Sequence, residues 1–201
     1  DTAYTLFWRD YCDWYLELIK PRLNGDDPAA KHVAATTATF LLKGLLKLLH
    51  PLVPFITEAI WQEIGRSESE SIMISTWPQT IPAFADAAAE RDFALLQELI
   101  SAIRNIRGEM NIPVGKTAEV LIAGNGQHAD LISGNTAYFK HLARVSSIQC
   151  HAELRRPKLE ASAVVKNLEL FVPLAGLIDV KVERGRLEKE RVRLEKLLES
   201  L

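Results

Sequence analysis

VGKT (114–117) holds the residue types of a phosphate-binding loop, in which glycine amides wrap a phosphate and a lysine neutralises it. Such a loop also needs a glycine five residues before Gly115, and position 110 is Met. The segment leads into a predicted strand, whereas a phosphate-binding loop opens a helix. We therefore interpret VGKT as an ordinary loop.

Cysteine and histidine are the other residues from which a catalytic or metal site could be built. Cys150 and His151 are adjacent, but neighbours on a strand point to opposite faces, so a small buried thiol is the better interpretation. No histidine shows HExxH or comparable ligand spacing, and no CxxC is present. Asp13 and Glu17 share a helical face, where we expect solvated carboxylates or partners of a neighbouring helix. The sequence therefore predicts no catalytic group and no metal site.

The first two predicted helices follow from apolar residues that recur every three or four positions. The first covers residues 2–20, and we expect Pro21 to end it before a turn at 24–26. The second covers residues 28–49, with Asp27 as its N-cap and proline at its first position.

Two prolines three residues apart break the apolar stretch LLKLLHPLVPFITEAIWQEI (45–64). Pro51 disfavours helical geometry at the preceding residue and so ends the long helix. Pro54 suits the first turn of the next helix, where its missing N–H would have no partner. The break folds one apolar face back on another, which predicts an antiparallel helix pair within a helical bundle.

The pattern changes after this pair. We expect an extended segment at 71–78, irregular chain at 82–85, and a helix that begins between 86 and 90 and ends at Glu109.

Two-residue alternation then predicts a small α/β unit. Its expected elements are strands at 117–123 and 146–150, short helices on either side of 133–135, and a hairpin of 161–165 with 168–173.

The tail from Asp179 is expected to be a highly charged helix. Apolar residues fall seven apart in it, as at the start of a coiled coil, at Val180, Leu187, Leu194 and Leu201. A lone helix this short is marginal in water, so it needs a partner. The fold class is therefore mainly α: an antiparallel bundle over 1–112, a small α/β unit over 113–176, and a coiled-coil-like helix over 177–201.

The composition, 48% hydrophobic and 25% charged, is that of an ordinary soluble globular protein. The net charge of −2 hides an asymmetry, because residues 1–110 hold 10 Lys/Arg against 15 Asp/Glu, and residues 111–201 hold 14 against 11. Any nucleic-acid surface must therefore be local. No apolar run approaches the roughly 18 residues of a membrane span, and the first residues are not a signal peptide. We expect a cytoplasmic fragment of a longer protein with no membrane partner.

Four stretches together resemble the C-terminal region of bacterial valyl-tRNA synthetases, which are class I aminoacyl-tRNA synthetases. They are YCDWYLELIKPRL (11–23), LLKLLHPLVPFITEAIWQ (45–62), IRNIRGEMNIPVGK (103–116) and FVPLAGLIDVKVERGRLEKE (171–190). The isoleucyl, leucyl and methionyl relatives share the proline-broken helix pair, whereas EMNIP and PLAGLIDV are more particular to the valyl enzymes. The resemblance covers essentially the whole chain in family order.

The resemblance implies an anticodon-binding helical bundle, a connecting α/β portion and the start of a coiled-coil arm that touches tRNA. It implies a parent enzyme that ligates valine to its tRNA with ATP and Mg²⁺ in protein biosynthesis. The fragment itself is expected to be non-catalytic, to hold no cofactor and to bind valine tRNAs but not DNA. We expect a monomer whose tail helix pairs with a missing second arm helix or with a neighbouring copy in a crystal.

Three departures from the family pattern are expected. The family's first bundle helix would precede residue 1, and the arm would continue beyond residue 201. Lys166-Asn167 forms a turn where relatives often carry glycine, but Asn tolerates positive φ, so we expect the hairpin to survive.

Residues that could bond to single-stranded bases or to phosphates are the candidates for tRNA contact. Near the end of the last bundle helix these are Arg104, Asn105, Arg107, Asn111 and Lys116. Weaker candidates on the expected solvent side of the second helix are Lys43 and Lys47. The arm candidates are Lys181, Arg184, Arg186, Lys189, Arg191 and Arg193, although such charge alternation usually indicates a solvated coiled-coil surface. Core packing is the expected role of Trp8, Trp14, Tyr15 and Trp61.

Two functions remain open on this basis. The first is a tRNA-binding appendage of a valine–tRNA ligase, which predicts salt-sensitive association with tRNA. The second is a protein-interaction module whose tail helix dimerises, motivated by the heptad leucines and the acidic bundle. It predicts dimerisation that is lost when Leu187 and Leu194 are changed to Asp.

Overall fold

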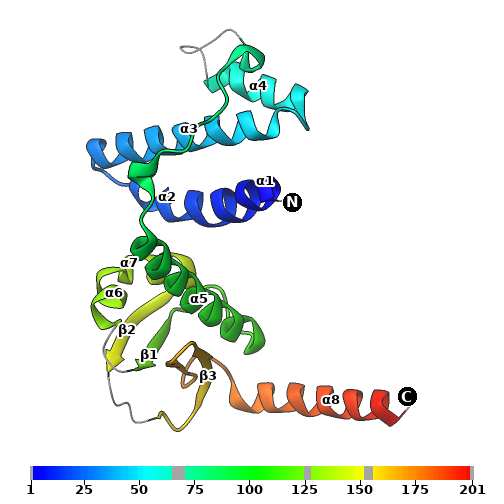
Figure 1. The fold of residues 1–201 in the computed structure, drawn as a ribbon. Coiled ribbons are helices and arrows are strands. Elements are labelled where there is room, and N and C mark those ends of the chain that lie inside the picture. The colour runs from blue at the N-terminus through cyan, green and yellow to red at the C-terminus, as the bar shows by residue number, and fades with distance from the viewer. Residues whose placement is uncertain (1, 65–70, 125–127, 152–155, 200–201) are drawn as a thin grey trace. The chain divides into compact units, whose positions relative to one another are not determined.

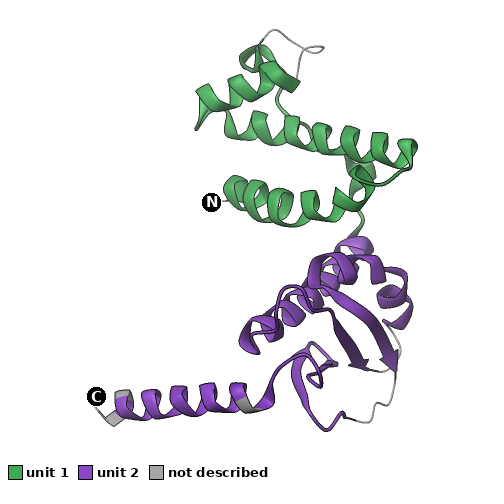
Figure 2. Cartoon of the chain, turned by 180° about the vertical axis from the view of Figure 1, so that it is seen from behind, with its two compact units in different colours: residues 1–86 green, residues 87–201 purple. Residues whose placement is uncertain are grey.

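A computed structural model describes residues 2–64, 71–124, 128–151 and 156–199. The chain forms two compact units, residues 1–86 and residues 87–201, shown in green and purple in Figure 2. The first unit is helical, and the second combines helices with a four-stranded mixed sheet (Figure 1). The prediction of a mainly helical chain with an α/β part after the first helices agrees with this architecture.

The N-terminal helical segment has three consecutive parts. They are α1 (Thr2–Thr5), the π-helical η1 (Leu6–Leu16) and α2 (Glu17–Leu23). A π-helix has more residues per turn than an α-helix, so positions expected on one face drift apart. Tyr11 is buried, whereas Trp8 is 54% exposed. The expectation that Trp8 belongs to the core was therefore wrong.

Pro21 lies inside α2, so the expectation that it ends the helix was also wrong. A proline costs one backbone hydrogen bond, but its φ is compatible with a helix. The helix continues because α2 packs against the next helix and buries Ile19. Asn24 N–H then donates to the Lys20 carbonyl oxygen at 2.9 Å and closes the last turn.

The long helix α3 (Pro28–Leu49) and its successor α4 (Pro54–Ile64) confirm the interpretation of the two prolines. Asp27 caps α3, because its carboxylate accepts from Ala29 N–H at 2.9 Å. The two helices pack together, and α4 brings the fully buried Trp61 against Leu46 of α3.

By length and composition alone, α3 could cross a membrane, contrary to the expectation that no segment could. Mean hydropathy over 18 residues tolerates the lysines that interrupt the apolar run. A single helix that passes this test is weak evidence for a membrane span; 17% of the apolar window of α3 is buried, and the helix packs against α2 and α4.

The segment predicted to be extended, 71–78, is extended at Ser71 and Ser75 but contains a 3₁₀ turn, η2 (Ile72–Ile74), between them. A second 3₁₀ turn, η3 (Pro82–Phe84), lies in the stretch predicted to be irregular. Ser71 caps η2 by accepting from Met73 N–H at 3.2 Å, and Ile72 is buried in the cluster around Trp61. A single buried side chain and a serine cap thus accompany the turn that interrupts the segment expected to be extended.

The second unit begins with α5 (Ala87–Glu109), which confirms the predicted helix. Its other elements are β1 (Ala118–Ala123), α6 (Ala129–Gly134), α7 (Thr136–Ala143), β2 (Val145–His151), β3 (Glu160–Val165), β4 (Leu168–Pro173) and α8 (Val180–Glu199). The strand order is β2-β1-β4-β3, with β1 and β2 parallel and the other neighbours antiparallel. The parallel pair needs a crossover, which α6 and α7 supply.

The core of the second unit lies where α5 packs against β3, β4 and α7. Leu99 and Ile103 of α5, Phe139 of α7 and Leu170 of β4 are all fully buried there. By packing, α5 therefore belongs to the same compact unit as the sheet. The predicted boundary at residue 112 separated the anticodon-binding bundle from the α/β unit and stays a prediction.

The β3–β4 hairpin forms with a two-residue turn, since Val165 pairs with Leu168. The residue in the left-handed region is Lys166, at φ 54°, and not Asn167 as expected. Lys166 Nζ lies 3.4 Å from the Glu98 carboxylate of α5, so an ion pair accompanies the strained conformation.

Glu58 of α4 tethers the chain that follows the helix. Its carboxylate accepts from Ser71 Oγ at 2.9 Å and from Ile72 N–H at 3.2 Å, and also from Gln62 at 2.6 Å. The hydrogen bond from Gln62, followed by those from Ser71 and Ile72 and by nearby His50, lowers the pKa of Glu58.

We predict that Glu58→Gln lowers the thermal unfolding midpoint at neutral pH. A carboxylate whose pKa is lower in the folded state stabilises the fold above its ordinary pKa, and this contribution is lost as pH falls through the folded-state pKa. The difference between wild type and variant should therefore shrink in acid, as followed by circular dichroism at a series of pH values. Glu63→Gln on the same helix is the matched control; a Glu58→Gln deficit that is independent of pH would contradict the prediction.

Candidate nucleic-acid interface

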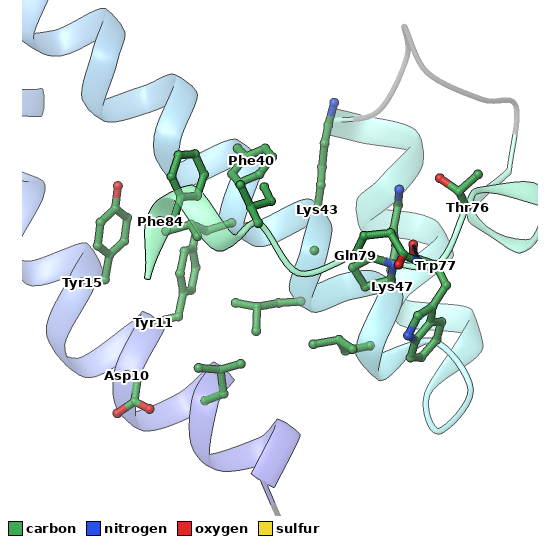
Figure 3. A pocket seen from close by; sticks show the side chains of 17 residues that line it. Asp10, Tyr11, Tyr15, Phe40, Lys43, Lys47, Thr76, Trp77, Gln79 and Phe84 are labelled. Atoms are coloured by element: carbon green, nitrogen blue, oxygen red, sulfur yellow. Dashed lines mark hydrogen bonds between the residues drawn. The ribbon is translucent and has the colours of Figure 1, made fainter. Parts of the chain in front are cut away.

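A cleft of about 670 Å³ lies within the first unit. It is bounded by η1, by α3 and by the irregular segment 76–84 (Figure 3). Aromatic side chains gather toward one end, namely Tyr11, Tyr15, Phe40 and Phe84. Polar and cationic side chains gather toward the other, namely Lys43, Lys47, Thr76, Trp77 and Gln79.

The aromatic end is held by ring contacts and by one buried hydroxyl. Tyr11 and Tyr15 stack with ring centroids 5.8 Å apart, and Phe40 meets Phe84 edge to face at 6.4 Å. Tyr11 Oη donates to the Ala38 carbonyl oxygen at 2.9 Å. Burial, chiefly, raises the pKa of Tyr11 to about 12, so the ring stays neutral at physiological pH. Aromatic rings dominate this end of the cleft, and Asp10, which also lines it, adds one carboxylate.

Lys43 and Lys47 are held at the other end by Trp61. Their Nζ atoms lie 5.9 and 5.3 Å from the centroid of the Trp61 ring. They were expected on the solvent side of the helix, and each is partly buried there. Cation–π attraction and stem packing place both ammonium groups beside the cleft with less conformational freedom than surface lysines have.

A second set of predicted contacts surrounds the end of α5. The helix ends in a Schellman motif, with Asn111 at φ 48°. Asn111 N–H donates to the Gly108 carbonyl at 3.1 Å, and Ile112 N–H donates to the Arg107 carbonyl at 2.9 Å. Asn111 itself is exposed, as is Asn105 six residues earlier.

Arg107 is buried, with 9% of its surface exposed. One guanidinium nitrogen, Nη2, donates to the carbonyl oxygens of Pro113 at 3.2 Å and Lys116 at 2.8 Å. Burial lowers the pKa of Arg107, and the positive charge of Arg144 lowers it further. The structure therefore gives Arg107 a role in holding the 112–117 loop.

Arg104 and Lys116 also bond to backbone carbonyls. Arg104 Nε donates to Leu142 O at 2.8 Å, although the residue is exposed. Lys116 Nζ donates to Gly176 O at 2.7 Å and to Leu177 O at 3.0 Å. Of the predicted set at this helix end, Asn105 and Asn111 keep exposed side chains, while Arg104, Arg107 and Lys116 join segments of the fold.

The arm candidates lie on α8, and every side chain of α8 that the structure describes is exposed. Arg186 donates to the Glu109 carbonyl oxygen at 3.0 Å. Arg191 pairs with Glu188 at 2.5 Å and with Glu195 at 3.6 Å. The exposed cations of α8 also include Arg184, Lys189 and Arg193, while the side chain of Lys181 falls outside the described part.

Sequence reasoning missed the contribution of segment 76–84 to the cleft. Trp77 is 55% exposed, and a tryptophan beside a proline in an irregular stretch, TWPQ (76–79), was the available signal. Among the described residues no group of three His, Cys, Asp or Glu side chains could hold a metal ion. Burial raises the pKa of both thiols, Cys12 and Cys150, so neither is set up as a thiolate nucleophile.

A helical first unit with a cleft that combines cations and aromatic rings is the kind of surface that single-stranded nucleic acid binds. Residues 1–122 match the family of anticodon-binding domains of tRNA ligases, and the chain belongs to this family.

Similar curated proteins include valine–tRNA ligases, which confirms the resemblance drawn from the four stretches. The chain is 39% identical over 188 residues to the enzyme of Enterococcus faecalis, covering 93% of this chain and 21% of that protein. It is 41% identical over 202 residues to the enzyme of Geobacter sulfurreducens, covering 98% and 22%. For Bacillus subtilis the identity is 37% over 199 residues, again covering 98% and 22%. The chain thus spans about one fifth of the length of these relatives.

We predict that Arg107→Met destabilises the second unit by about 1–3 kcal/mol, because the carbonyl oxygens of Pro113 and Lys116 lose a charged donor. Chemical unfolding followed by circular dichroism measures the change. Asn105→Ala, an exposed neighbour on the same helix, is the control and should change stability by less than about 0.5 kcal/mol. Equal stability of Arg107→Met and wild type would show that the guanidinium does not hold the loop.

Proposed function

We propose that this chain binds the anticodon region of a tRNA and belongs to a longer valine–tRNA ligase. The observation that carries the proposal is the match of residues 1–122 to the anticodon-binding family. The identity to valine–tRNA ligases supports valine tRNAs as the partner. In this proposal ATP, Mg²⁺ and the ligation of valine belong to the rest of the enzyme, which acts as a cytoplasmic monomer.

The cleft of the first unit has the properties that unstacked anticodon bases require. Bases stack on aromatic rings whatever their sequence, and the exposed ring of Trp77 and those of Phe40 and Phe84 offer such faces. The amide of Gln79 and the hydroxyl of Thr76 can hydrogen-bond to base edges. A volume of about 670 Å³ lies within the range of roughly 300–1,000 Å³ that small-ligand pockets occupy.

Lys43 and Lys47 would neutralise backbone phosphates next to these bases. The two residues are one helical turn apart, and Trp61 holds both ammonium groups on the same side of α3. Because the whole chain carries a net charge of −2, such fixed local cations would have to supply the attraction. In the second unit, Asn105 and Asn111 are further candidates for bases, and Arg184, Lys189 and Arg193 are candidates for phosphates.

We predict that tRNA binds with an affinity that falls steeply with salt, because phosphate contacts release counterions. Lys43→Met and Lys47→Met keep an apolar stem over Trp61 and remove the charge. Each should weaken binding and reduce the slope of log affinity against log salt by about one. Fluorescence anisotropy with labelled tRNA measures both quantities, and thermal unfolding checks the fold.

Lys31→Met is the matched control, since Lys31 is exposed in the first turn of the same helix and does not line the cleft. The proposal fails if wild type shows no salt-sensitive association with tRNA. The assignment to the cleft fails if Lys31→Met changes the salt slope as much as Lys43→Met does.

A second candidate function rests on α8, which exposes an apolar stripe. Leu187, Leu194 and Leu198 are 48%, 52% and 71% exposed. Leucines at this spacing are typical of a coiled-coil seam, so α8 could pair with a second helix in the same enzyme or with a second copy of the chain.

We predict that self-association through this stripe, where it occurs, is lost in the double variant Leu187→Asp, Leu194→Asp, because charges cannot be buried in the seam. Sedimentation velocity over a range of protein concentrations measures it. Glu190→Gln on the same helix should leave the sedimentation unchanged. A wild-type monomer at the highest concentration would exclude the dimer and leave the interpretation of α8 as the start of a tRNA-contacting arm.

A further inference from the structure

The base of α8 is joined to the end of α5 at two places. The first is a turn that precedes α8, in which Gly176 adopts φ 76° and Leu177 N–H donates to Leu174 O at 3.0 Å. Lys116 Nζ bonds to the carbonyl oxygens of both Gly176 and Leu177, at 2.7 and 3.0 Å. One ammonium group therefore fixes the two peptide units at which the chain turns into the helix.

Lys116 is itself held from the other side. Its carbonyl oxygen accepts the 2.8 Å bond from the buried guanidinium of Arg107, which belongs to α5. The loop that carries Lys116 is thus bonded to α5. The side chain of Lys116 in turn bonds to the turn at 176–177.

The second junction lies further along α8. Arg186 donates at 3.0 Å to the carbonyl oxygen of Glu109, the last residue of α5. The Schellman motif uses the carbonyls of Arg107 and Gly108, so the Glu109 carbonyl is one of those that a helix end leaves for an outside donor. A cation is also favoured at this position, since the C-terminus of α5 carries the negative end of the helix dipole.

These two junctions are far enough apart to define a direction. Leu177 lies in the turn before α8, and Arg186 lies six positions after Val180, the first residue of the helix, which corresponds to about 9 Å along its axis. A helix bonded to the second unit at one point can still change its direction, whereas bonds at two points fix the direction of its axis. Beyond Arg186 the described side chains of α8 are exposed, and Figure 2 shows the helix extending away from the rest of the second unit.

We infer that Lys116 and Arg186 are positioning residues, which set the direction of α8 and so determine what part of a bound RNA the helix can reach. The consequence for RNA rests on the proposed function, while the direction of α8 does not. Both residues carry charge of the right sign for phosphate, but their donors face backbone carbonyls of the protein. They therefore act on binding through the placement of α8.

The test measures the direction of α8 by electron–electron distance spectroscopy. Spin labels are placed at Lys140→Cys on α7 and Leu198→Cys near the end of α8, in a chain whose Cys12 and Cys150 are replaced by Ser. Wild type should give a narrow distance distribution. Lys116→Met and Arg186→Gln should each broaden it, and the double variant should broaden it most.

Conservative and control variants separate positioning from a general loss of structure. Lys116→Arg and Arg186→Lys keep a donor and should restore a narrow distribution. Arg193→Gln removes the same charge two turns further along α8 and should leave the distribution unchanged. Circular dichroism confirms folding of each variant, and Arg186, being on the surface, gives a variant that folds even if Lys116→Met does not. An unchanged distribution in the double variant overturns the inference.

Titration of the same unlabelled variants with tRNA supplies an independent measurement. A side chain that itself contacts phosphate lowers the salt slope by about one when its charge is removed. In a background in which Arg184, Lys189 and Arg193 are changed to Gln, Lys116→Met and Arg186→Gln should leave the salt slope unchanged, because their effect on RNA passes through the cations of α8. A further fall in slope of about one in that background would show a direct phosphate contact and overturn the inference. If wild type binds no tRNA, the proposed function fails, and the distance distributions still decide whether the two residues direct α8.

Discussion

The second unit depends on how the chain leaves α5. The last carbonyls of a helix have no partner within the helix, so other donors must satisfy them. In this unit Asn111 provides the left-handed residue, Ile112 is buried, and the guanidinium of Arg107 is covered by the loop that follows. Burying a charge costs free energy unless the charge is hydrogen-bonded, and carbonyl oxygens of the loop accept from Arg107. These bonds fix the position of Lys116, whose side chain in turn bonds to the turn before α8.

The positively charged candidates for RNA binding fall into two groups, according to the partner of their N–H donors. Arg104, Arg107, Lys116 and Arg186 all bond to backbone carbonyls of the second unit. Lys43 and Lys47 instead lie over the aromatic ring of Trp61. An ammonium group held in this way can still present N–H donors to a phosphate, and a side chain already confined by a ring loses less conformational entropy on binding.

Local signals in the sequence predicted most elements. Asp27 and Pro28 mark the start of α3, and Pro51 and Pro54 mark the break after it. Each of these signals acts on backbone geometry only a few residues away. The failures arise where distant packing decides. Pro21 is tolerated because α2 packs against α3, and Ile72 packs into the cluster around Trp61 within the segment that was expected to be extended.

The candidate site shows the same limit in another form. A sequence gives the type and spacing of side chains but not the partner of each donor, so Arg107 and Asn105 looked equally suitable for RNA. Two positions along a helix turn the side chain by about 200°, which is enough to place one guanidinium in the core and one amide in solvent. Periodicity in fact contained this distinction, because Ile103 and Ile106 mark the buried face, and Arg107 lies four and one positions from them. Buried polar groups in proteins are hydrogen-bonded. An arginine on a predicted apolar face is therefore better interpreted as a donor to nearby backbone carbonyls than as a ligand-binding residue.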